Sequence, residues 1–295
     1  MKGIVLAGGT GSRLWPITRS VSKQLLPVYD KPMIYYPIST LMLAGIREIL
    51  IITTPQDQLA FKELLGDGSN FGVFLSYATQ EKPEGLAQAF IIGQEFIGQD
   101  SVALILGDNI FHGKGLGREL QTSFSGSGGH IFTYEVSDPS RYGVLTLNED
   151  GEPESIYEKP EFPNSNLAVT GLYFFDNHVS EIVKHIVPSS RGELEITSII
   201  QNYIDFRQLN FTRLSRGAAW LDTGTTDSLL DASNYIRILE QRTGLNIGCL
   251  EEIALSQDWI SLSTLKDLVA KKGNSSYYTY VAGILKSQSD SINNN

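Results

Sequence analysis

The sequence predicts an α/β protein with a Rossmann-like, mostly parallel, doubly wound sheet flanked by helices, followed by a helical C-terminal region. Short apolar runs recur through the first two thirds of the chain without clean apolar–polar alternation, which is typical of a sheet covered on both faces. Stretches with helical spacing separate these runs, as in a parallel sheet. From about Asp176 onward the pattern becomes more helical.

The individual elements follow in chain order from these patterns. Strands are expected at 3–8, 48–53, 102–107, 130–136 and 169–175. Residues near helical spacing predict helices at 34–45 and 59–66. In the C-terminal third, helical patterns span 178–186, 193–204, 227–242, 250–257 and 263–271. The end of the chain is polar, and a disordered tail is expected at 289–295.

The composition excludes several classes of protein. The 295 residues carry a formal net charge of −10, and nucleic acid is a poor partner because duplex binding needs a basic patch. Cys249 is the only cysteine, so no intrachain disulfide can form and a reducing compartment is expected. No stretch approaches the roughly 18 apolar residues of a membrane span, and the N-terminus does not resemble a signal peptide. We expect a soluble, cytoplasmic protein with no membrane partner.

A glycine-rich loop, "LAGGTGSRLWP" (Leu6–Pro16), follows the first expected strand. It lacks the Gly-Lys-Ser/Thr of a P-loop, and Leu14 replaces the third glycine of a dinucleotide fingerprint. Its backbone N–H groups can still hold an anion, with positive charge from Arg13 and Lys23. A tight turn after a strand explains the same glycines without a ligand, so the loop alone leaves both interpretations open.

Several polar residues further along the chain also allow two interpretations. Asp108 and Asp222 each follow a short apolar run, near the strand ends where ligands bind in open α/β sheets. Such aspartates either form turns or bind a metal ion, and Mg²⁺ suits one or two carboxylates together with phosphate oxygens. Glu158 and Lys159 are as readily explained as solvated surface. Gln80 is either an exposed amide or a partner for a pyrimidine edge.

A longer resemblance distinguishes between these interpretations. The segment "LAGGTGSRLWPITRSVSKQLLPVYDKPMIYYPI" resembles the N-terminal signature of sugar-1-phosphate nucleotidylyltransferases, and its "KQLLP" and "MIYYP" pieces are similar to the thymidylyl branch of that family. The likeness continues in order through "QEKPEGLAQAF", "LGDNIFHG", "RYGV", "YEKP", "AVTGLYFFD", "RGELEIT" and "WLDTGT", and it covers roughly residues 2 to 285. One departure is Ser198, because the family usually has Asp after "RGELEIT".

The resemblance implies a role for each candidate residue. The nucleotide would be bound by Leu6, Gly8, Gly9, Thr10, Gly11, Arg13, Lys23, Gln24, Gln80, Pro83, Gly85 and Asp108. The sugar phosphate would be bound by Asn109, Tyr142, Gly143, Glu158, Lys159, Val169 and Gly171, with Glu193 at the pocket edge. The catalytic residues would be Arg13, Lys23 and Lys159, and Asp108 and Asp222 would hold Mg²⁺. Trp220 is expected to pack beneath the Asp222 loop.

The resemblance also implies a reaction and an architecture. The substrates would be dTTP and α-D-glucose 1-phosphate, with release of pyrophosphate by a homotetramer that carries a regulatory nucleotide-sugar site near its C-terminal helices. The catalytic domain would span 1–240, with a nucleotide-binding part at about 1–130 and a sugar-phosphate-binding part at about 131–240, and a helical extension would span 241–288. Two alternatives stay open, namely a family member that uses UTP, CTP or ATP, and a catalytically silent regulator that binds a nucleotide sugar. The charged candidate residues are all present, which disfavours the regulator.

Overall fold

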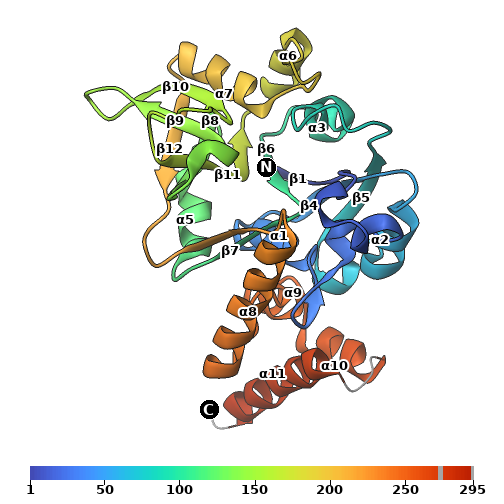
Figure 1. The fold of residues 1–295 in the computed structure, drawn as a ribbon. Coiled ribbons are helices and arrows are strands. Elements are labelled where there is room, and N and C mark those ends of the chain that lie inside the picture. The colour runs from blue at the N-terminus through green and yellow to red at the C-terminus, as the bar shows by residue number, and fades with distance from the viewer. Residues whose placement is uncertain (272–274, 294–295) are drawn as a thin grey trace.

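The chain folds around a central sheet with helices on both faces (Figure 1). The structure is a computed structural model, and it describes residues 1–271 and 275–293. Four neighbouring strands run parallel, in the order β6-β1-β4-β5: β1 (Lys2–Ala7), β4 (Glu48–Thr53), β5 (Phe74–Thr79) and β6 (Val102–Leu106). The expected Rossmann-like α/β fold is therefore confirmed.

The other half of the sheet is largely antiparallel. Here β11 (Leu167–Phe175) runs antiparallel to β6, with β8 (Gly129–Glu135) along its other edge, and β9 (Gly143–Leu147) pairs with it at Ala168 on the same side as β6. The outer strands are β10 (Pro153–Glu158), beside β9, and β12 (Leu209–Arg213), which is parallel to β8. Since an apolar run does not encode the direction of its strand, the sequence did not predict this antiparallel part.

Two small antiparallel sheets of two strands each lie outside the main sheet. One pairs β7 (Asn109–His112) with β13 (Ala219–Asp222), and the other pairs β2 (Pro27–Val28) with β3 (Lys31–Pro32). The β7–β13 pair joins segments more than a hundred positions apart, which brings the second half of the chain back to the end of β6.

Each predicted helical pattern contains a helix, and the structure has further helices at 88–92, 94–97, 116–123 and 276–293. The first half contains α1 (Tyr35–Leu43), α2 (Gln58–Leu65), α3 (Gln88–Ile92), α4 (Gln94–Ile97) and α5 (Leu116–Ser123). The second half contains α6 (Val179–Ile182), α7 (Ile196–Asp205), α8 (Thr226–Thr243), α9 (Leu250–Ser256), α10 (Leu262–Lys271) and α11 (Ser276–Asn293). Short 3₁₀ turns lie between them, at Ser12–Leu14, Ile17–Arg19, Lys23–Leu25, Ser69–Phe71, Pro139–Arg141 and Val183–His185. No helix within the described residues is long and apolar enough to cross a membrane.

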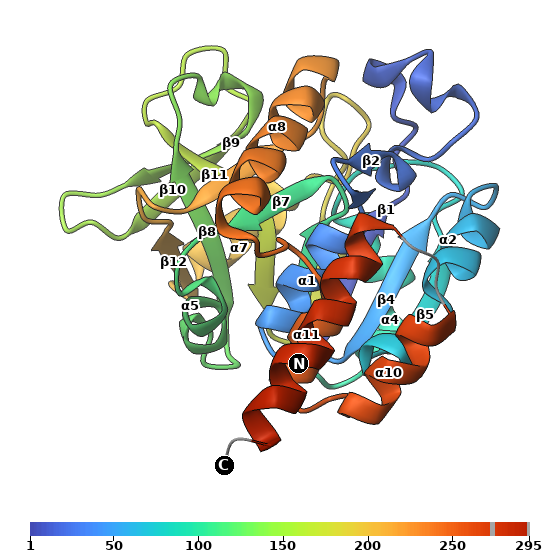
Figure 2. The ribbon, with the colours of Figure 1, turned by 90° about the horizontal axis from the view of Figure 1, so that it is seen from below.

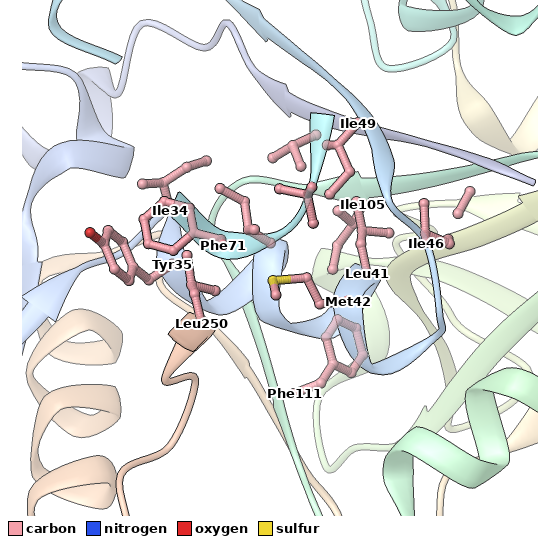
Figure 3. Packing of buried hydrophobic residues seen from close by; sticks show 14 of the residues in the cluster. Ile34, Tyr35, Leu41, Met42, Ile46, Ile49, Phe71, Ile105, Phe111 and Leu250 are labelled. Carbon is pink, nitrogen blue, oxygen red and sulfur yellow. The ribbon is translucent and has the colours of Figure 1, made fainter. Parts of the chain in front are cut away.

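Alternate side chains of the central strands enter two separate cores. In β1, Ile4 and Leu6 pack on the face covered by α3, α6 and α7, whereas Val5 packs on the face covered by α1. Because both faces of the central sheet are buried, neither set of alternating side chains has to be polar. This explains the continuous apolar runs in the sequence. Figure 3 shows the second core, where Ile49 and Ile105 of the sheet meet the side chains of α1.

The C-terminal helices cover the outer side of α1. Leu250 of α9 lies beside Ile34 and Tyr35 in Figure 3, and Figure 2 shows α11 crossing over α1 with α10 beside it. The domain boundaries expected from the sequence stay predictions, and the structure places residue 240 inside α8. The helix α11 continues to Asn293, beyond the point at which a disordered tail was expected, and residues 294–295 lie outside the described residues.

Candidate active site

The carboxyl ends of β1 and β6 open into a cavity of about 460 Å³. This is the edge at which ligands bind in open α/β sheets. The glycine loop after β1 forms one wall, where Gly11 has a left-handed φ of 60° and its carbonyl accepts a hydrogen bond from Thr18 Oγ1 at 2.6 Å. The loop then makes the 3₁₀ turn that carries Arg13. The left-handed conformation of Gly11 therefore turns the backbone along the edge of the cavity. A tight turn and an anion-binding loop both require such a turn, so this geometry is compatible with either interpretation.

Strand pairing brings the two candidate metal ligands together. Asp222 ends β13 directly opposite Asn109 of β7, and Asp108 precedes Asn109. The next residue, Thr223, donates from its backbone N and its Oγ1 to the Asp108 carbonyl, at 3.2 and 2.8 Å. A capping box at Thr225, the N-cap of α8, holds the end of this loop.

Each of the two carboxylates has a cationic neighbour. Lys23, which is only 6% exposed, places its Nζ 2.5 Å from Asp108 Oδ2, and Arg141 Nη2 lies 3.4 Å from Asp222 Oδ2. Burial acts to raise the pKa of Asp108, but the charge and hydrogen bond of Lys23 outweigh it and leave that pKa lowered. Burial and the nearby Asp108 charge raise the pKa of Asp222.

This donor set fits a divalent cation shared with a phosphate. Two carboxylates whose charges repel one another are stabilised by a cation between them, and Mg²⁺ takes one or two carboxylates plus substrate oxygens. Among the side chains that the structure describes, no three or more His, Cys, Asp or Glu gather as a metal cluster. The pair Asp108 and Asp222 could therefore hold a metal together with a substrate, but does not form a closed structural site.

Asn109 holds this corner of the site in place. Its Oδ1 accepts hydrogen bonds from Trp220 Nε1 at 2.6 Å and from the Gly171 backbone N at 3.2 Å, and its Nδ2 donates to Asp108 Oδ1 at 3.0 Å. A Cβ at Gly171 would lie 2.6 Å from Asn109 Oδ1, which explains the glycine there. The Asn109 amide thus binds the protein itself, and Trp220, which is buried and also lines the cavity, has its ring 4.9 Å from that of Tyr142.

The candidate sugar-phosphate residues also line the cavity. Lys159 follows β10 in a left-handed conformation, with φ of 44°, and its backbone N donates to the Tyr142 carbonyl at 3.0 Å. Its Nζ lies 3.3 Å from Glu158 Oε1. A left-handed non-glycine residue is strained, and such strain concentrates at functional sites.

Arg191 binds the carboxylates around this part of the cavity. Its Nη2 lies 3.1 Å from Glu158 Oε1, 2.8 Å from Glu195 Oε1 and 3.6 Å from Glu193 Oε2. Partial burial acts to lower the pKa of Arg191, but these carboxylates outweigh it and raise that pKa. The sequence singled out the motif "RGELEIT" and Glu193 but not Arg191, because the pairing depends on a strand 33 positions away.

A backbone junction connects the nucleotide and sugar parts of the site. Gly85 has a φ of 110°, and a Cβ there would lie 2.3 Å from the Leu194 carbonyl oxygen. On either side of it, the Ala87 N donates to Leu194 O at 3.1 Å and the Leu194 N donates to Glu84 O at 2.7 Å. Only glycine permits this approach, so the "PEGLAQ" and "RGELEIT" segments meet there.

The structure brings almost all of the candidate residues into this cavity. Its lining includes the predicted nucleotide and sugar-phosphate residues Leu6, Gly9, Thr10, Gly11, Arg13, Lys23, Gln24, Gln80, Pro83, Gly85, Asp108, Asn109, Tyr142, Gly143, Glu158, Lys159, Val169 and Gly171, together with Asp222 and Glu193. Gly8 is not in the lining, but it lies against Gln80. Two further lining residues, Arg141 and Glu195, were not predicted from the sequence. Arg141 is the first residue of the motif "RYGV", and Glu195 lies within "RGELEIT".

Comparisons with known proteins give the class of this enzyme. A family model described as nucleotidyl transferase matches residues 2–238. A glucose-1-phosphate thymidylyltransferase from Neisseria meningitidis is 53% identical over 287 residues, which cover 97% of this chain and 100% of the relative. The same enzyme from Mycolicibacterium smegmatis is 55% identical over 285 residues, covering 97% and 99% of the two chains. A crystal structure from Bacillus anthracis, assigned as such a thymidylyltransferase and bound to sucrose, matches with a TM-score of 0.74 and 40% identity over 80% of this chain and 95% of that one.

The chain therefore belongs to the nucleotidyl transferase family, and it is an enzyme. Within that family, its relatives at more than half identity over nearly the whole chain are bacterial glucose-1-phosphate thymidylyltransferases. Family members generally use a divalent metal ion and act on small molecules, a sugar and a nucleotide. The resemblance inferred from the motifs is confirmed.

Proposed function

We propose that this enzyme joins dTTP and α-D-glucose 1-phosphate to form dTDP-glucose and pyrophosphate. The observation that carries the proposal is one cavity that holds cationic side chains for two separate phosphate groups. Arg13 and Lys23 lie at the glycine loop, and Lys159 lies at the end of β10 beside Glu158. The names of the relatives support the choice of thymidylyl donor and of glucose 1-phosphate as acceptor.

The reaction exchanges one phosphorus–oxygen bond for another. An oxygen of the glucose 1-phosphate attacks the α-phosphorus of dTTP, the bond from the α-phosphorus to the bridging oxygen breaks, and its electron pair leaves with pyrophosphate. The attacking phosphate is already ionised, so no side-chain base is needed. Catalysis then consists of positioning and charge stabilisation, with Lys159 on the incoming phosphate, Lys23 on the triphosphate and Arg13 on the departing pyrophosphate.

Asp108 and Asp222 would hold Mg²⁺, which would supply charge neutralisation at the α-phosphate. Lys23 pairs with Asp108 and Arg141 with Asp222, and all four side chains line the cavity. The remaining polar groups of the site bind and orient the substrates, with Glu158 accepting sugar hydroxyls and Gln80 meeting the base. The homotetramer and the cytoplasmic location implied by the resemblance stay predictions.

Pyrophosphate release with each nucleoside triphosphate, glucose 1-phosphate and Mg²⁺ tests the proposal. We expect dTTP to be preferred, with UTP weaker by about 10- to 200-fold. Thymine and uracil present the same hydrogen-bonding edge, so the pocket separates dTTP from UTP only through the 5-methyl group and the missing 2′-hydroxyl, and a methyl-sized difference discriminates only to that extent. Equal or better turnover with CTP or ATP would overturn the nucleotide assignment. Binding of a nucleotide sugar without any turnover would favour the silent regulator.

The carboxylate pair has its own test. Asp108→Asn and Asp222→Asn keep the shape of each side chain, and each variant should lose most of its activity. Asp222→Asn should melt near the wild-type temperature, whereas Asp108→Asn also leaves the buried Lys23 without its partner and should lose stability. Two ligands of one metal act as a unit, and the double variant should therefore be little worse than the poorer single variant. A turn-forming Asp222 would instead lower the melting temperature of its variant, and additive losses of kcat would rule out a shared metal.

A further inference from the structure

A chain of hydrogen bonds fixes the orientation of one glutamine amide at the edge of the cavity. Gln88 is the first residue of α3 and does not line the cavity. Its Oε1 accepts a hydrogen bond from the backbone N of Glu84 at 3.2 Å, and its Nε2 donates to Glu84 Oε2 at 2.9 Å. A backbone N–H can only donate and an ionised carboxylate can only accept, so these two contacts fix which end of the Gln88 amide is oxygen.

The next residue in this series of hydrogen bonds is Gln80, which is almost fully buried at 4% exposure. Its amide lies 2.6 Å from Gln88 Oε1. Because that oxygen is an acceptor, the group facing it must be the Nε2 of Gln80. On the other side, a Cβ at Gly8 would lie 2.3 Å from Gln80 Oε1, so the Gln80 amide oxygen packs directly against the glycine loop.

These contacts leave Gln80 with one free acceptor and one free donor. Across the described parts of the chain, no donor reaches its Oε1, and only one of its two Nε2 hydrogens is used. Thymine and uracil present an N3–H donor beside carbonyl acceptors, whereas cytosine presents an N3 acceptor beside an amino donor. A glutamine that can rotate its amide by 180° pairs with either edge, since its two ends then exchange places.

We propose that Gln88 is a positioning residue that holds the Gln80 amide in the orientation that pairs with thymine and uracil and rejects cytosine. The inference rests on the proposed function, because it takes Gln80 as the partner of the base. Gln88 does not touch the substrate. It acts by presenting an acceptor to Gln80 Nε2, and Glu84 keeps that acceptor in place.

The test compares dUTP with dCTP, since these nucleotides differ only at the edge that Gln80 would read. Gln88→Met removes the acceptor at nearly constant volume, and we expect the dUTP:dCTP ratio of kcat/KM to fall about tenfold, the worth of one hydrogen bond. Gln88→Glu, made together with Glu84→Gln so that position 84 donates to the new carboxylate, keeps an acceptor and should keep the ratio. Gln88→Lys offers only donors, so it should turn the Gln80 oxygen toward position 88 and lower the ratio further.

A matched control variant and melting temperatures complete the experiment. Gln94→Met makes the same exchange at the first residue of α4, outside the cavity, and should leave the ratio unchanged. Melting temperatures of all variants separate misfolding from a change of selectivity. Equal losses with both nucleotides in Gln88→Met, or the same ratio in the Glu and Lys variants, would overturn the inference.

The outcome for the proposed function can be read separately. A wild-type enzyme that does not use dTTP would reject the proposed function before any variant is made. If the wild type uses dTTP but Gln80→Met leaves the dUTP:dCTP ratio intact, Gln80 does not read the base and the inference about Gln88 is wrong. If the ratio changes in Gln80→Met but not in Gln88→Met, the base contact stands and the positioning role is refuted.

Discussion

The backbone junction at Gly85 supports a quantitative prediction. In Gly85→Ala the new Cβ would lie 2.3 Å from the carbonyl oxygen and 2.5 Å from the backbone nitrogen of Leu194, where ordinary contacts begin at 3.4 Å. The two segments must therefore separate by about 1 Å. This weakens two backbone hydrogen bonds, worth about 1 kcal/mol each, and a φ of 110° adds strain of about 1–3 kcal/mol for a residue with a side chain.

The expected destabilisation is about 3–5 kcal/mol, which corresponds to a fall in Tm of roughly 6–10 °C for a chain of this size. Gly45→Ala is the matched control, because Gly45 also has a positive φ, at 81°, but has no atom within 4 Å of its Cβ position. It should lose only about 1 kcal/mol. Calorimetry measures both, and steady-state kinetics should show KM raised for both substrates in Gly85→Ala alone. Equal Tm losses in the two variants, with normal KM values, would refute the junction.

Other predictions concern single side chains. Burial lowers the pKa of His130 from 6.5 to about 4, so the unfolded chain binds more protons than the folded chain below pH 6.5. The free energy of unfolding should therefore fall by up to about 3 kcal/mol as the pH is lowered from 6.5 to 4. His130→Gln should reduce this pH dependence in denaturant titrations, and an unchanged pH dependence would refute the buried neutral imidazole. Arg13→Ala should lower kcat by about 100-fold, since the Arg13 side chain would act on charge that develops as pyrophosphate leaves. Lys159→Ala should chiefly raise the KM for glucose 1-phosphate. If instead Arg13→Ala raised that KM and Lys159→Ala lowered kcat, the two phosphate sites would be wrongly assigned. Trp220→Phe removes the 2.6 Å hydrogen bond to Asn109 and should lower kcat/KM about tenfold with a small change in Tm; a normal kcat/KM would show that Asp108 needs no such support.

Much of the fold could be predicted from the sequence because buried strands have a recognisable composition. The expected strand 48–53 coincides with β4, and the other expected strands differ from the structure by one or two residues at their ends. Among the missed strands, β5, β9, β10 and β12 are more exposed, so they lack a continuous apolar run. Strand direction and the two-stranded β7–β13 pair depend on contacts between distant segments, which local patterns do not encode.

The candidate site could be predicted as a set of residues but not as a set of contacts. Motif resemblance identified the residues at the ends of β1, β6 and β10, because a short motif keeps its residues together wherever the fold places it. It could not identify the partners of those residues. Lys23 and Asp108 are 85 positions apart, and Arg141 and Asp222 are 81 apart. The position of Gln88 next to Gln80 likewise follows from the turn before α3, not from any periodicity.

These pairings determine which variants are informative about catalysis. A charge removed from water must be compensated, and removing one partner of a buried pair leaves the other uncompensated. Loss of Lys23 would leave the buried Asp108 carboxylate without a compensating charge. The kinetics of a Lys23 variant would therefore reflect both the lost substrate contact and damage to the site itself. Arg13 makes no ion pair with any residue that the structure describes, and Lys159 is half exposed beside Glu158, where solvent weakens the pair. Kinetic changes in variants of Arg13 and Lys159 therefore report on the phosphates more directly than those of Lys23.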